Sequence, residues 1–477
     1  MRPVADITPL LDLAHARALD WLARVPTRPV GATATRAQLL HALGGALPWQ
    51  GAPAADVLDA LCAGVEPGLV STVGPRYFGF VTGGAVPVTV ATEWLASAWD
   101  QNGALYVMSP AAAVVEDIVS GWVLELLGLP ASASVGFVTG CHMANFTCLA
   151  AARHEVLRRH EWDVETQGLQ RAPAITVVVG GEVHVSITGA LRMLGIGTSE
   201  LRVANADGQG RMRPDALAAQ LAGVTGPVIV CAQAGNVNTG ASDPLHAILS
   251  IAHAHGAWVH VDGAFGLWAA AVPELAPQVA SLSQADSWAT DAHKWLNVPY
   301  DSGLAIVAHP APHRAALSLR ASYLQRGDDE ERMGMDWVPE SSRRARGFAL
   351  YTLIRTLGRE GLIDLFRRSC AHARDMAQQL AAVPGLSILN DVVLNQVLVR
   401  CSSPRHDGDD DEMTRRVMAS IQAEGTCWAG GAVWQGRQVL RISVSNWSTT
   451  REDIARSAEA IARAYRAHCA TDASASA

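Results

Sequence analysis

The chain has 477 residues, 49% of them hydrophobic and 17% charged, so it is long enough for about two or three packed units, and wholesale disorder is excluded. Its formal net charge is -8 and no run of Lys or Arg stands out, which argues against nucleic acid and membrane surfaces as partners. The apolar stretches are too short to span a bilayer, residues 1–10 lack a secretory pattern, and the eight cysteines are scattered without a C-x-x-C pair, so we expect a cytoplasmic protein with reduced thiols.

The N-terminal segment is predicted to be mostly helical, with breaks at the Pro- and Gly-containing stretches 26–31 and 48–53. After it, short apolar runs alternate with helical patterns such as 143–158 and 244–254. Several runs are continuously apolar, as expected of strands that are buried on both faces of a parallel sheet. The runs are 135–138, 175–179, 228–231, 258–261, 286–290 and 304–307. This alternation predicts a large α/β domain with a mostly parallel sheet and right-handed crossovers.

The pattern changes after residue 310. Two long helices are predicted at 346–357 and 361–380, and a final helix at 452–468. Strands are predicted at 386–389, 392–400 and 439–444. The small polar residues from Thr471 onward predict a frayed end. We therefore expect an N-terminal helical segment (1–70), a large α/β domain (71–310), a loop with a small C-terminal α+β domain (311–470), and a flexible tail (471–477).

Two clusters are considered as metal sites and set aside. The acidic run 407–412 does not have the spacing of an EF-hand loop, so we expect a solvated surface loop. His253, His255 and His260 lie where a helix end leads into a strand, so the three side chains need not converge. We expect structural or surface histidines and no metal site.

Chemistry-bearing residues follow the predicted strands one after another. The first strand leads into Thr139-Gly140-Cys141-His142, which opens a helix, and the free N–H groups of a helix start favour a phosphate. Because the carboxyl ends of the strands in an open α/β sheet share one edge, the residues at these ends are expected to meet. The later strands are followed by His184, the turn 234–240 with Asn236, Asp262, and the segment 291–295 with Lys294.

This set of side chains matches the requirements of pyridoxal 5'-phosphate (PLP). A lysine forms the Schiff base, a carboxylate keeps the pyridine nitrogen protonated so that the ring can accept electrons, and an anion site holds the phosphate. Burial and the nearby cationic ring would lower the pKa of Lys294, which suits a nucleophilic amine.

At these positions the sequence resembles the group II PLP-dependent amino-acid decarboxylases, over about residues 70–465. The most specific segment, 291–296 (DAHKWL), is similar to the family's cofactor-lysine motif. Residues 260–266 (HVDGAFG) are similar to its HVDAAYAG strand end, and 234–244 (AGNVNTGASDP) to its AGTT…G-x-FDP turn. The resemblance implies fold type I, the aspartate aminotransferase fold, with a large PLP-binding domain and a small C-terminal domain.

The resemblance also implies roles for single residues. Lys294 carries the cofactor, Asp262 pairs with its ring nitrogen, and His184 stacks on the ring near the substrate carboxylate. Ala264 lies against the ring, and Arg441 sits in the family's small-domain arginine strand. The implied cofactor-binding residues are Thr139, Gly140, Cys141, His142, His184, Asn236, Asp262, Ala264, Asp291, His293 and Lys294.

The sequence departs from the family pattern at a few positions. Cys141 and His142 stand where small or hydroxyl residues are commoner, although the backbone amide of His142 can still serve. Ser242 replaces a phenylalanine and Gly263 an alanine. These departures bear on substrate identity more than on cofactor binding.

Tyr323 distinguishes between the reactions of the family. A tyrosine on a mobile loop at this distance after the lysine protonates Cα in the family once CO2 has left, whereas relatives with phenylalanine tend toward aldehyde formation. Tyr323 therefore predicts simple decarboxylation of an L-amino acid to the amine and CO2. An ordinary packing role for Tyr323 is the alternative at this position. At the level of function, the alternatives are an aminotransferase or aldehyde-forming oxidase, a non-catalytic PLP-fold protein, and a domain that binds another phosphorylated ligand.

The resemblance implies a homodimer, because the family builds its site across a dimer interface. The segment 77–81 with Trp94, Trp99 and Asn102 is expected either to line that site or to belong to the core. The only small-molecule partner expected besides the cofactor is the amino acid, whose identity stays open at this point.

Overall fold

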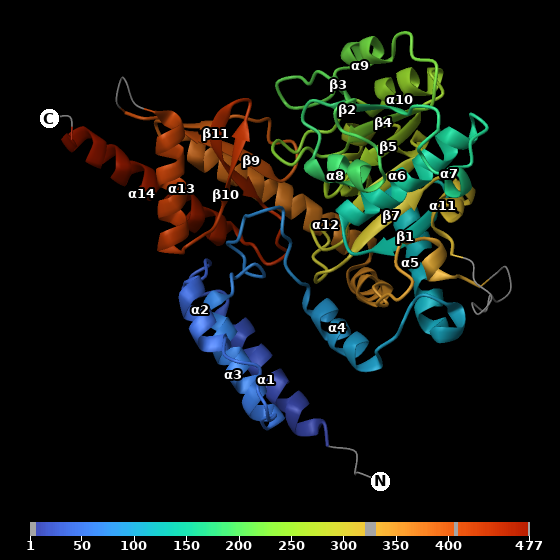
Figure 1. The fold of residues 1–477 in the computed structure, drawn as a ribbon. Helices are drawn as coiled ribbons and strands as arrows, with labels where there is room; N and C mark the ends of the chain where they lie inside the picture. Colours follow the sequence, from blue (N-terminus) through green and yellow to red (C-terminus); the bar gives the residue numbers. More distant parts are fainter. Residues whose placement is uncertain (1–5, 320–330, 405–408, 476–477) are drawn as a thin grey trace.

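The N-terminal helices form an arm that projects away from the rest of the chain (Figure 1). The computed structural model describes residues 6–319, 331–404 and 409–475. The arm contains α1 (Thr8–Arg24), α2 (Arg36–Leu43) and α3 (Ala54–Val65). Within α1 and α2 no residue is buried, although both helices pack on α3. The arm therefore has almost no core of its own.

A seven-stranded sheet forms the centre of the larger unit. Its strands lie in the order β1-β7-β6-β5-β4-β2-β3, and β7 runs antiparallel to both of its neighbours while the other pairs are parallel. Every residue of β1, β5, β6 and β7 is buried, as expected of strands that are covered on both faces. The strands are β1 (Ser134–Val138), β2 (Thr176–Gly180), β3 (Arg202–Ala204), β4 (Val228–Gln233), β5 (Trp258–Asp262), β6 (Ser287–Asp291) and β7 (Gly303–Val307).

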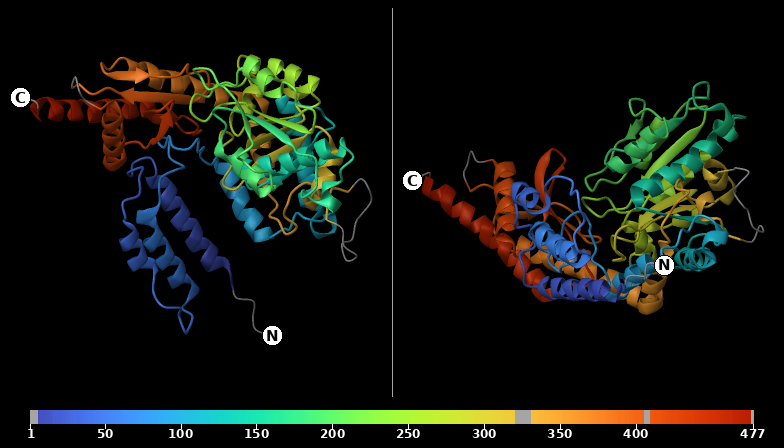
Figure 2. Two further views of the ribbon diagram at one scale, coloured as in Figure 1. Left: turned by 45° about the horizontal axis from the view of Figure 1, so that its top comes forward. Right: turned by 60° about the horizontal axis from the view of Figure 1, so that its bottom comes forward.

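Helices cover this sheet, as the green to yellow part of Figure 2 shows. Helix α6 packs against the central strands β5, β6 and β7, and α10 packs against β4 and β5. Four tryptophans are fully buried in this unit, namely Trp258, Trp268, Trp288 and Trp295. The helices are α4 (Pro87–Trp99), α5 (Pro110–Leu127), α6 (Cys141–Arg158), α7 (Val164–Gln167), α8 (Val185–Met193), α9 (Pro214–Leu221), α10 (Leu245–Ala254) and α11 (Pro310–Leu317).

A second, four-stranded sheet follows in the C-terminal part, with the antiparallel order β10-β11-β9-β8. The long helix α12 leads into it and changes direction at Gly358, whose φ of 61° lies in the left-handed region. Helix α13 and the end of α12 cover the sheet, and α14 packs against both of these helices. The elements are α12 (Gly347–Ala381), β8 (Leu386–Ile388), β9 (Gln396–Cys401), α13 (Asp410–Glu424), β10 (Gly430–Trp434), β11 (Arg437–Ser443) and α14 (Arg451–Ala475).

The structure differs from the sequence-based expectation in three places. Strand β3 was not predicted, since three residues give almost no periodic signal. Strand β10 was not predicted either, because its two glycines disfavour a strand, yet a two-residue turn with positive φ at Gln435 and Gly436 pairs it with β11. The frayed end expected from residue 471 is wrong, since α14 continues to Ala475, and Asp472 forms an ion pair with Arg416 at 3.0 Å.

The predicted split of the long C-terminal helix at 358–360 agrees with the break at Gly358. All eight cysteines are free thiols, and six of them are buried. Across residues 6–319, 331–404 and 409–475, none of the helices combines the length and apolar character that crossing a membrane requires.

Candidate active site

The carboxyl ends of β5 and β6 bring the predicted lysine and aspartates to one sheet edge. Asp262 is the last residue of β5 and Asp291 the last residue of β6. Lys294 follows three residues after Asp291, and its Nζ lies 3.0 Å from Asp291 Oδ2. Lys294 is also the only lysine among the 37 Lys and Arg residues of the chain. A single side-chain amine therefore stands at this edge, and no other lysine could take its place.

The Lys294 amine is held in its charged form. Burial lowers the pKa of Lys294, but the carboxylate charges of Asp291 and Asp262 raise it, and the net result is a pKa above its ordinary value. The lowered pKa predicted from the sequence refers to the site with the cofactor bound, and it stays a prediction. That expectation relied on a cationic ring next to the amine, and the side chains around Lys294 supply carboxylates instead.

Three donors hold the carboxylate of Asp262, a residue that is 4% exposed. Its Oδ1 accepts from the backbone N–H of Ala264 and from the thiol of Cys141, each at 3.3 Å. Its Oδ2 accepts from Asn145 Nδ2 at 3.3 Å and lies 3.4 Å from the Ser186 hydroxyl. A buried negative charge is tolerated only with such donors around it. Asp262 is therefore a buried anion with a defined orientation.

The start of α6 lies against the end of β6. The N–H of Cys141 donates to Asp291 Oδ1 at 2.5 Å, which ties the first amide of the helix to the strand end. Gly140 caps the helix, and a Cβ on Gly303 would lie 2.5 Å from its Cα, so β7 passes very close to this turn. The next N–H groups of the 18-residue helix have no intrahelical acceptor, and the helix dipole is positive here. An anion such as phosphate is favoured at this end.

His184 caps the start of α8 with its ring. Its Nδ1 accepts from the Ser186 N–H at 3.2 Å and lies 2.7 Å from the Ser186 hydroxyl. Burial lowers the pKa of His184, so the ring is neutral and carries one proton. Because Nδ1 accepts a hydrogen bond, this proton is on Nε2. Within the described part of the chain, Nε2 has no acceptor. His184 therefore has one N–H to offer to a ligand.

The turn after β4 is shaped by Asn236. Its Oδ1 accepts from Asn238 N–H at 2.8 Å, and its Nδ2 donates to Gln233 Oε1 at 3.0 Å. These bonds occupy both ends of the amide, and a direct cofactor contact of Asn236 stays a prediction. Asn238 Oδ1 accepts from Arg441 Nη1 at 3.3 Å, which connects β11 to this turn. Burial lowers the pKa of Arg441, whose charge also reaches His184.

His293 lies between Asp291 and Tyr300. Its Nε2 is 3.4 Å from Asp291 Oδ1, and its ring centroid is 4.4 Å from that of Tyr300. Burial lowers the pKa of His293, and its Nδ1 accepts from Ser302 N–H at 3.2 Å, so the ring is neutral and donates through Nε2. Of the other predicted residues, Thr139 and Ala264 are half-buried and His142 is exposed.

Tyr323 lies outside the described residues. The structure describes the chain again from residue 331. There, Arg332 Nε donates to Glu116 Oε2 at 3.1 Å, and Arg343 Nη2 donates to Glu116 Oε1 at 2.6 Å. Glu116 is 1% exposed, and Arg343 also donates to the Phe137 carbonyl of β1 at 3.0 Å. This buried Arg-Glu-Arg cluster fastens the chain that follows the Tyr323 segment to α5 and to the sheet.

Sequence reasoning missed three residues of this region. Asn145 follows Cys141 by four positions on α6, so helical spacing from the predicted helix start could have found it. Ser186 follows His184 by two positions and could have been found as a cap partner. Glu116 carries no local signal, because its partner Arg343 lies 227 residues away.

Comparisons with known proteins agree on one family. The model of the pyridoxal-dependent decarboxylase conserved domain matches residues 38–402. L-2,4-diaminobutyrate decarboxylase of Rhizobium meliloti is 30% identical over 389 residues, which cover 80% of this chain and 76% of that protein. Tyrosine decarboxylase 2 of Narcissus pseudonarcissus is 24% identical over 415 residues, with 84% and 82% covered. Phenylacetaldehyde synthase of Arabidopsis thaliana is 26% identical over 405 residues, with 81% of each chain covered.

Solved structures share the fold over nearly the whole chain. The crystal structure of Oryza sativa TDC with PLP and tryptamine has a TM-score of 0.91 at 24% identity, and it covers 98% of this chain and 99% of that chain. The crystal structure of mouse CSAD has a TM-score of 0.89 at 23% identity, with 97% and 99% covered. The predicted fold class is thereby confirmed.

Proposed function

This chain belongs to the pyridoxal-dependent decarboxylase family, and we propose that it removes the α-carboxylate of an L-amino acid as CO2 and releases the amine, with Lys294 as the cofactor lysine. It is a PLP-dependent carboxy-lyase. The observation that carries the assignment of the site is the position of Lys294, the single lysine of the chain, beside Asp291 and at the same sheet edge as the buried anion Asp262.

The residues at this edge fit PLP by their chemistry. Lys294 offers the amine for the cofactor aldehyde, and Asp262 offers a carboxylate that three donors have already oriented. The start of α6 at Gly140 offers backbone N–H donors for the phosphate. When bound, the cofactor supplies a conjugated ring that accepts the electron pair left by the departing carboxylate.

Each side chain then has a defined task. Asp262 holds a proton at the ring nitrogen, because a buried anion stabilises a cation beside it. His184 donates its Nε2–H toward the substrate carboxylate and orients it. Asp291 accepts a hydrogen bond from Nζ of Lys294 and keeps this amine in place. Tyr323 delivers a proton to Cα after CO2 has left. Orientation of the reacting groups supplies a large part of the acceleration.

The test is CO2 release from a panel of L-amino acids, with identification of the second product. We expect at least one substrate to give amine and CO2 in equal amounts. Keto acid without CO2 would instead assign the chain to aminotransferases. Borohydride reduction of the purified protein should attach the cofactor to a single peptide, the one containing Lys294. Absence of both trapped cofactor and turnover would overturn the proposal.

Aldehyde formation is the second candidate, because the relatives include phenylacetaldehyde synthases. Tyr323 favours the amine, since its hydroxyl can protonate Cα before oxygen reacts. Tyr323→Phe should slow amine formation by about 10²–10⁴-fold, the usual worth of a general acid, and should give some aldehyde, ammonia and peroxide under air. Equal rates of amine formation would exclude Tyr323 as the acid. A wild type that already gives mainly aldehyde would establish the second candidate.

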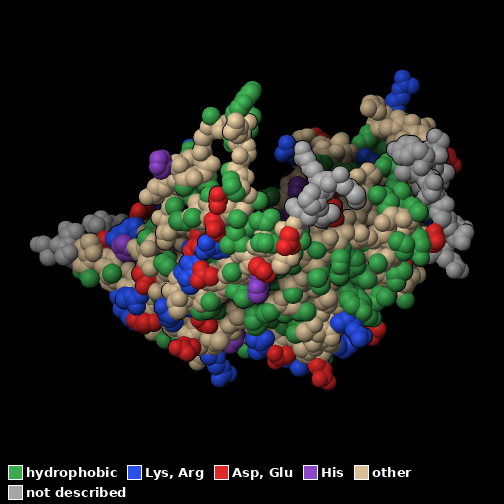
Figure 3. Space-filling model, turned by 90° about the horizontal axis from the view of Figure 1, so that it is seen from below, with side chains coloured by type: hydrophobic (Ala, Val, Ile, Leu, Met, Phe, Trp, Pro, Cys, Tyr) green, Lys and Arg blue, Asp and Glu red, His purple; other side chains and the backbone are tan. Residues whose placement is uncertain are grey.

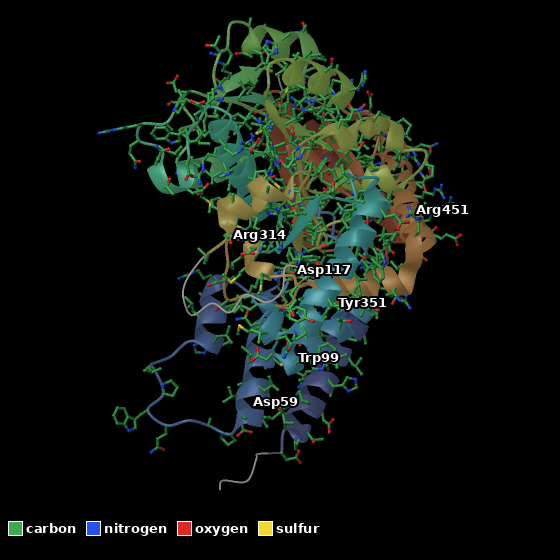
Figure 4. The ribbon with its side chains drawn as sticks, turned by 90° about the vertical axis from the view of Figure 1, so that its right-hand side faces the viewer. Asp59, Trp99, Asp117, Arg314, Tyr351 and Arg451 are labelled. Carbon is green, nitrogen blue, oxygen red and sulfur yellow. The ribbon has the colours of Figure 1, made fainter. Side chains whose placement is uncertain are left out.

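A homodimer with shared sites is also part of the proposal. In the loop between α2 and α3, Leu47 is 95% exposed and Trp49 is 98% exposed, and Trp99 at the end of α4 is half exposed. Hydrophobic side chains gather over the face seen in Figure 3, and in the view of Figure 4 Trp99 lies between Asp59 of α3 and Tyr351 of α12. Monomers rarely expose so many large apolar side chains, and a second copy of this chain would cover them.

Mixing two inactive variants tests the shared site. One variant carries Lys294→Ala, and the other carries a change at Phe80, which is 62% exposed in the segment 77–81. If each site draws residues from both subunits, mixed dimers regain activity. No recovery after confirmed subunit exchange would show that the sites are not shared.

The location and the domain division complete the proposal. The eight free thiols favour the reducing cytoplasm. The division at 1–70, 71–310 and 311–470 is supported by the projecting arm, the seven-stranded sheet and the four-stranded sheet. Limited proteolysis that cuts near these boundaries would support the division.

A further inference from the structure

A row of buried, hydrogen-bonded side chains leads to Asp262, and the mechanism above gives it no task. Asn145 Oδ1 lies 2.9 Å from His260 Nε2, and Asn145 Nδ2 lies 3.3 Å from Asp262 Oδ2. On the other side, Ser287 Oγ lies 2.9 Å from His260 Nδ1 and 2.9 Å from Trp258 Nε1. The four residues Asn145, His260, Ser287 and Trp258 are each 0% exposed.

Donor and acceptor chemistry determines the direction of every bond in this row. A carboxylate only accepts, so Asn145 must turn its NH2 group toward Asp262 and its carbonyl oxygen toward His260. His260 must then carry its proton on Nε2. Burial lowers the pKa of His260 to about 4, although the charge of Asp262 opposes this, so the ring is neutral and Nδ1 accepts from the Ser287 hydroxyl. The Trp258 N–H can only donate, and it donates to Ser287.

All four bonds therefore point the same way, from Trp258 to Asp262. Hydrogen bonds in such a chain polarise one another, and in a buried region their effect is stronger than in water. The end of the row that faces Asp262 is an N–H donor, which stabilises the carboxylate charge and limits rotation of the side chain. No side chain of the row could reverse its donor and acceptor groups, by an amide flip or a change of tautomer, without losing one of these hydrogen bonds.

We propose that His260 is a positioning residue that, through Asn145, holds the Asp262 carboxylate in the orientation required by the cofactor's ring nitrogen. This inference rests on the proposed function, because it needs Asp262 to face that nitrogen. It predicts an effect that depends on the nitrogen itself, whereas a histidine that only fills the core would affect any ligand of the site alike.

The test compares two ligands on protein freed of cofactor. PLP and its analogue with a CH group in place of the ring nitrogen are titrated, and tryptophan fluorescence gives the Kd of each. Wild type should prefer PLP. His260→Leu, which removes both ring nitrogens, should raise the Kd of PLP about tenfold, as expected for a lost hydrogen bond to a charged group. The Kd of the analogue should stay unchanged.

Two further variants make the test specific. His260→Gln keeps an N–H donor for Asn145 and should regain most of the preference for PLP. His313→Leu is the matched control, because His313 is also 0% exposed and hydrogen-bonded, to Ser134 Oγ at 2.8 Å and the Trp337 carbonyl at 3.0 Å, without contact to Asp262. It should leave the preference at the wild-type value.

The outcomes separate the two proposals. An unchanged ratio of the two Kd values in His260→Leu overturns the positioning role while leaving the proposed function intact. Failure of wild type to bind PLP overturns the proposed function itself, before any variant is made. If His260→Leu does not fold, Ser287→Ala is measured in its place. This variant removes the hydroxyl that donates to His260 Nδ1 and so keeps the ring proton on Nε2, and it changes the side-chain volume only slightly. A loss of preference in Ser287→Ala supports the role, and an unchanged ratio overturns it.

Discussion

The N-terminal arm and the site at the ends of β5 and β6 differ in how far their side chains are buried and paired within the chain. At the site, Asp262, Asn145 and His260 are buried and hydrogen-bonded within one chain. In the arm, α1 and α2 bury no residue, and Leu47 and Trp49 are almost fully exposed. The polar side chains around Asp262 find their hydrogen-bond partners within one chain, whereas the arm leaves large apolar side chains exposed. Substitutions at the site should therefore lower activity or stability strongly, and substitutions on the outer faces of the arm should change the stability of a monomer little.

Replacement of the single lysine should have the largest effect. Lys294→Ala should abolish the cofactor's visible absorption band and nearly all turnover. Lys294→Arg keeps a positive charge beside Asp291 but has no amine that can bond to an aldehyde, so it should fail equally. The absorption spectrum and CO2 release measure this. A retained band in Lys294→Ala would refute the assignment.

Disruption of the buried Arg-Glu-Arg cluster should have the largest effect on stability. Glu116→Ala leaves Arg343 buried without its carboxylate and leaves Arg332 only its pair with Asp117, and such a loss typically costs about 3–5 kcal/mol of unfolding free energy. Urea denaturation measures the loss. The matched control is Glu125→Ala on the same helix, because its pair with Arg359 is exposed and is worth less than about 1 kcal/mol. Equal losses in both variants would contradict the prediction.

Removal of the Asp262 charge should affect catalysis more than folding. Asp262→Asn keeps the shape of the side chain but loses the charge that stabilises the protonated ring nitrogen. We expect a loss of about 3 kcal/mol of transition-state stabilisation, or about 10²–10³-fold in kcat/KM. Circular dichroism should show an unchanged fold. A near-normal kcat would mean that Asp262 is structural only.

An exposed ion pair within the arm should matter least. Arg17 Nη2 and Asp59 Oδ1 lie 2.7 Å apart between α1 and α3, and both side chains are about half exposed. Asp59→Asn should change the unfolding free energy hardly at all, because water screens such pairs. A loss comparable to that of Glu116→Ala would show that the arm has a tighter internal structure than its exposure indicates.

The sequence predicted the elements that have a strong local pattern. Six of the strands in the large sheet were expected within a residue or two of their observed bounds, because most of them are apolar runs buried on both faces. The strands β3 and β10 were not expected, because one is too short and the other contains two glycines. The end of α14 was placed too early, since the ion pair between Asp472 and Arg416 has no local sequence signal.

By itself, the sequence determined that a lysine, an aspartate and a helix start stand at the ends of successive buried strands, because apolar periodicity and a short motif are local properties. Only the tertiary structure decided the charge state of Lys294, since the carboxylates around it come from two different strands. It also decided the orientation of Asp262, which is held by Asn145 from 117 residues away, and the proton position on His260. These features depend on distances and directions between side chains that are remote in sequence, and such contacts leave no periodic or local pattern to read.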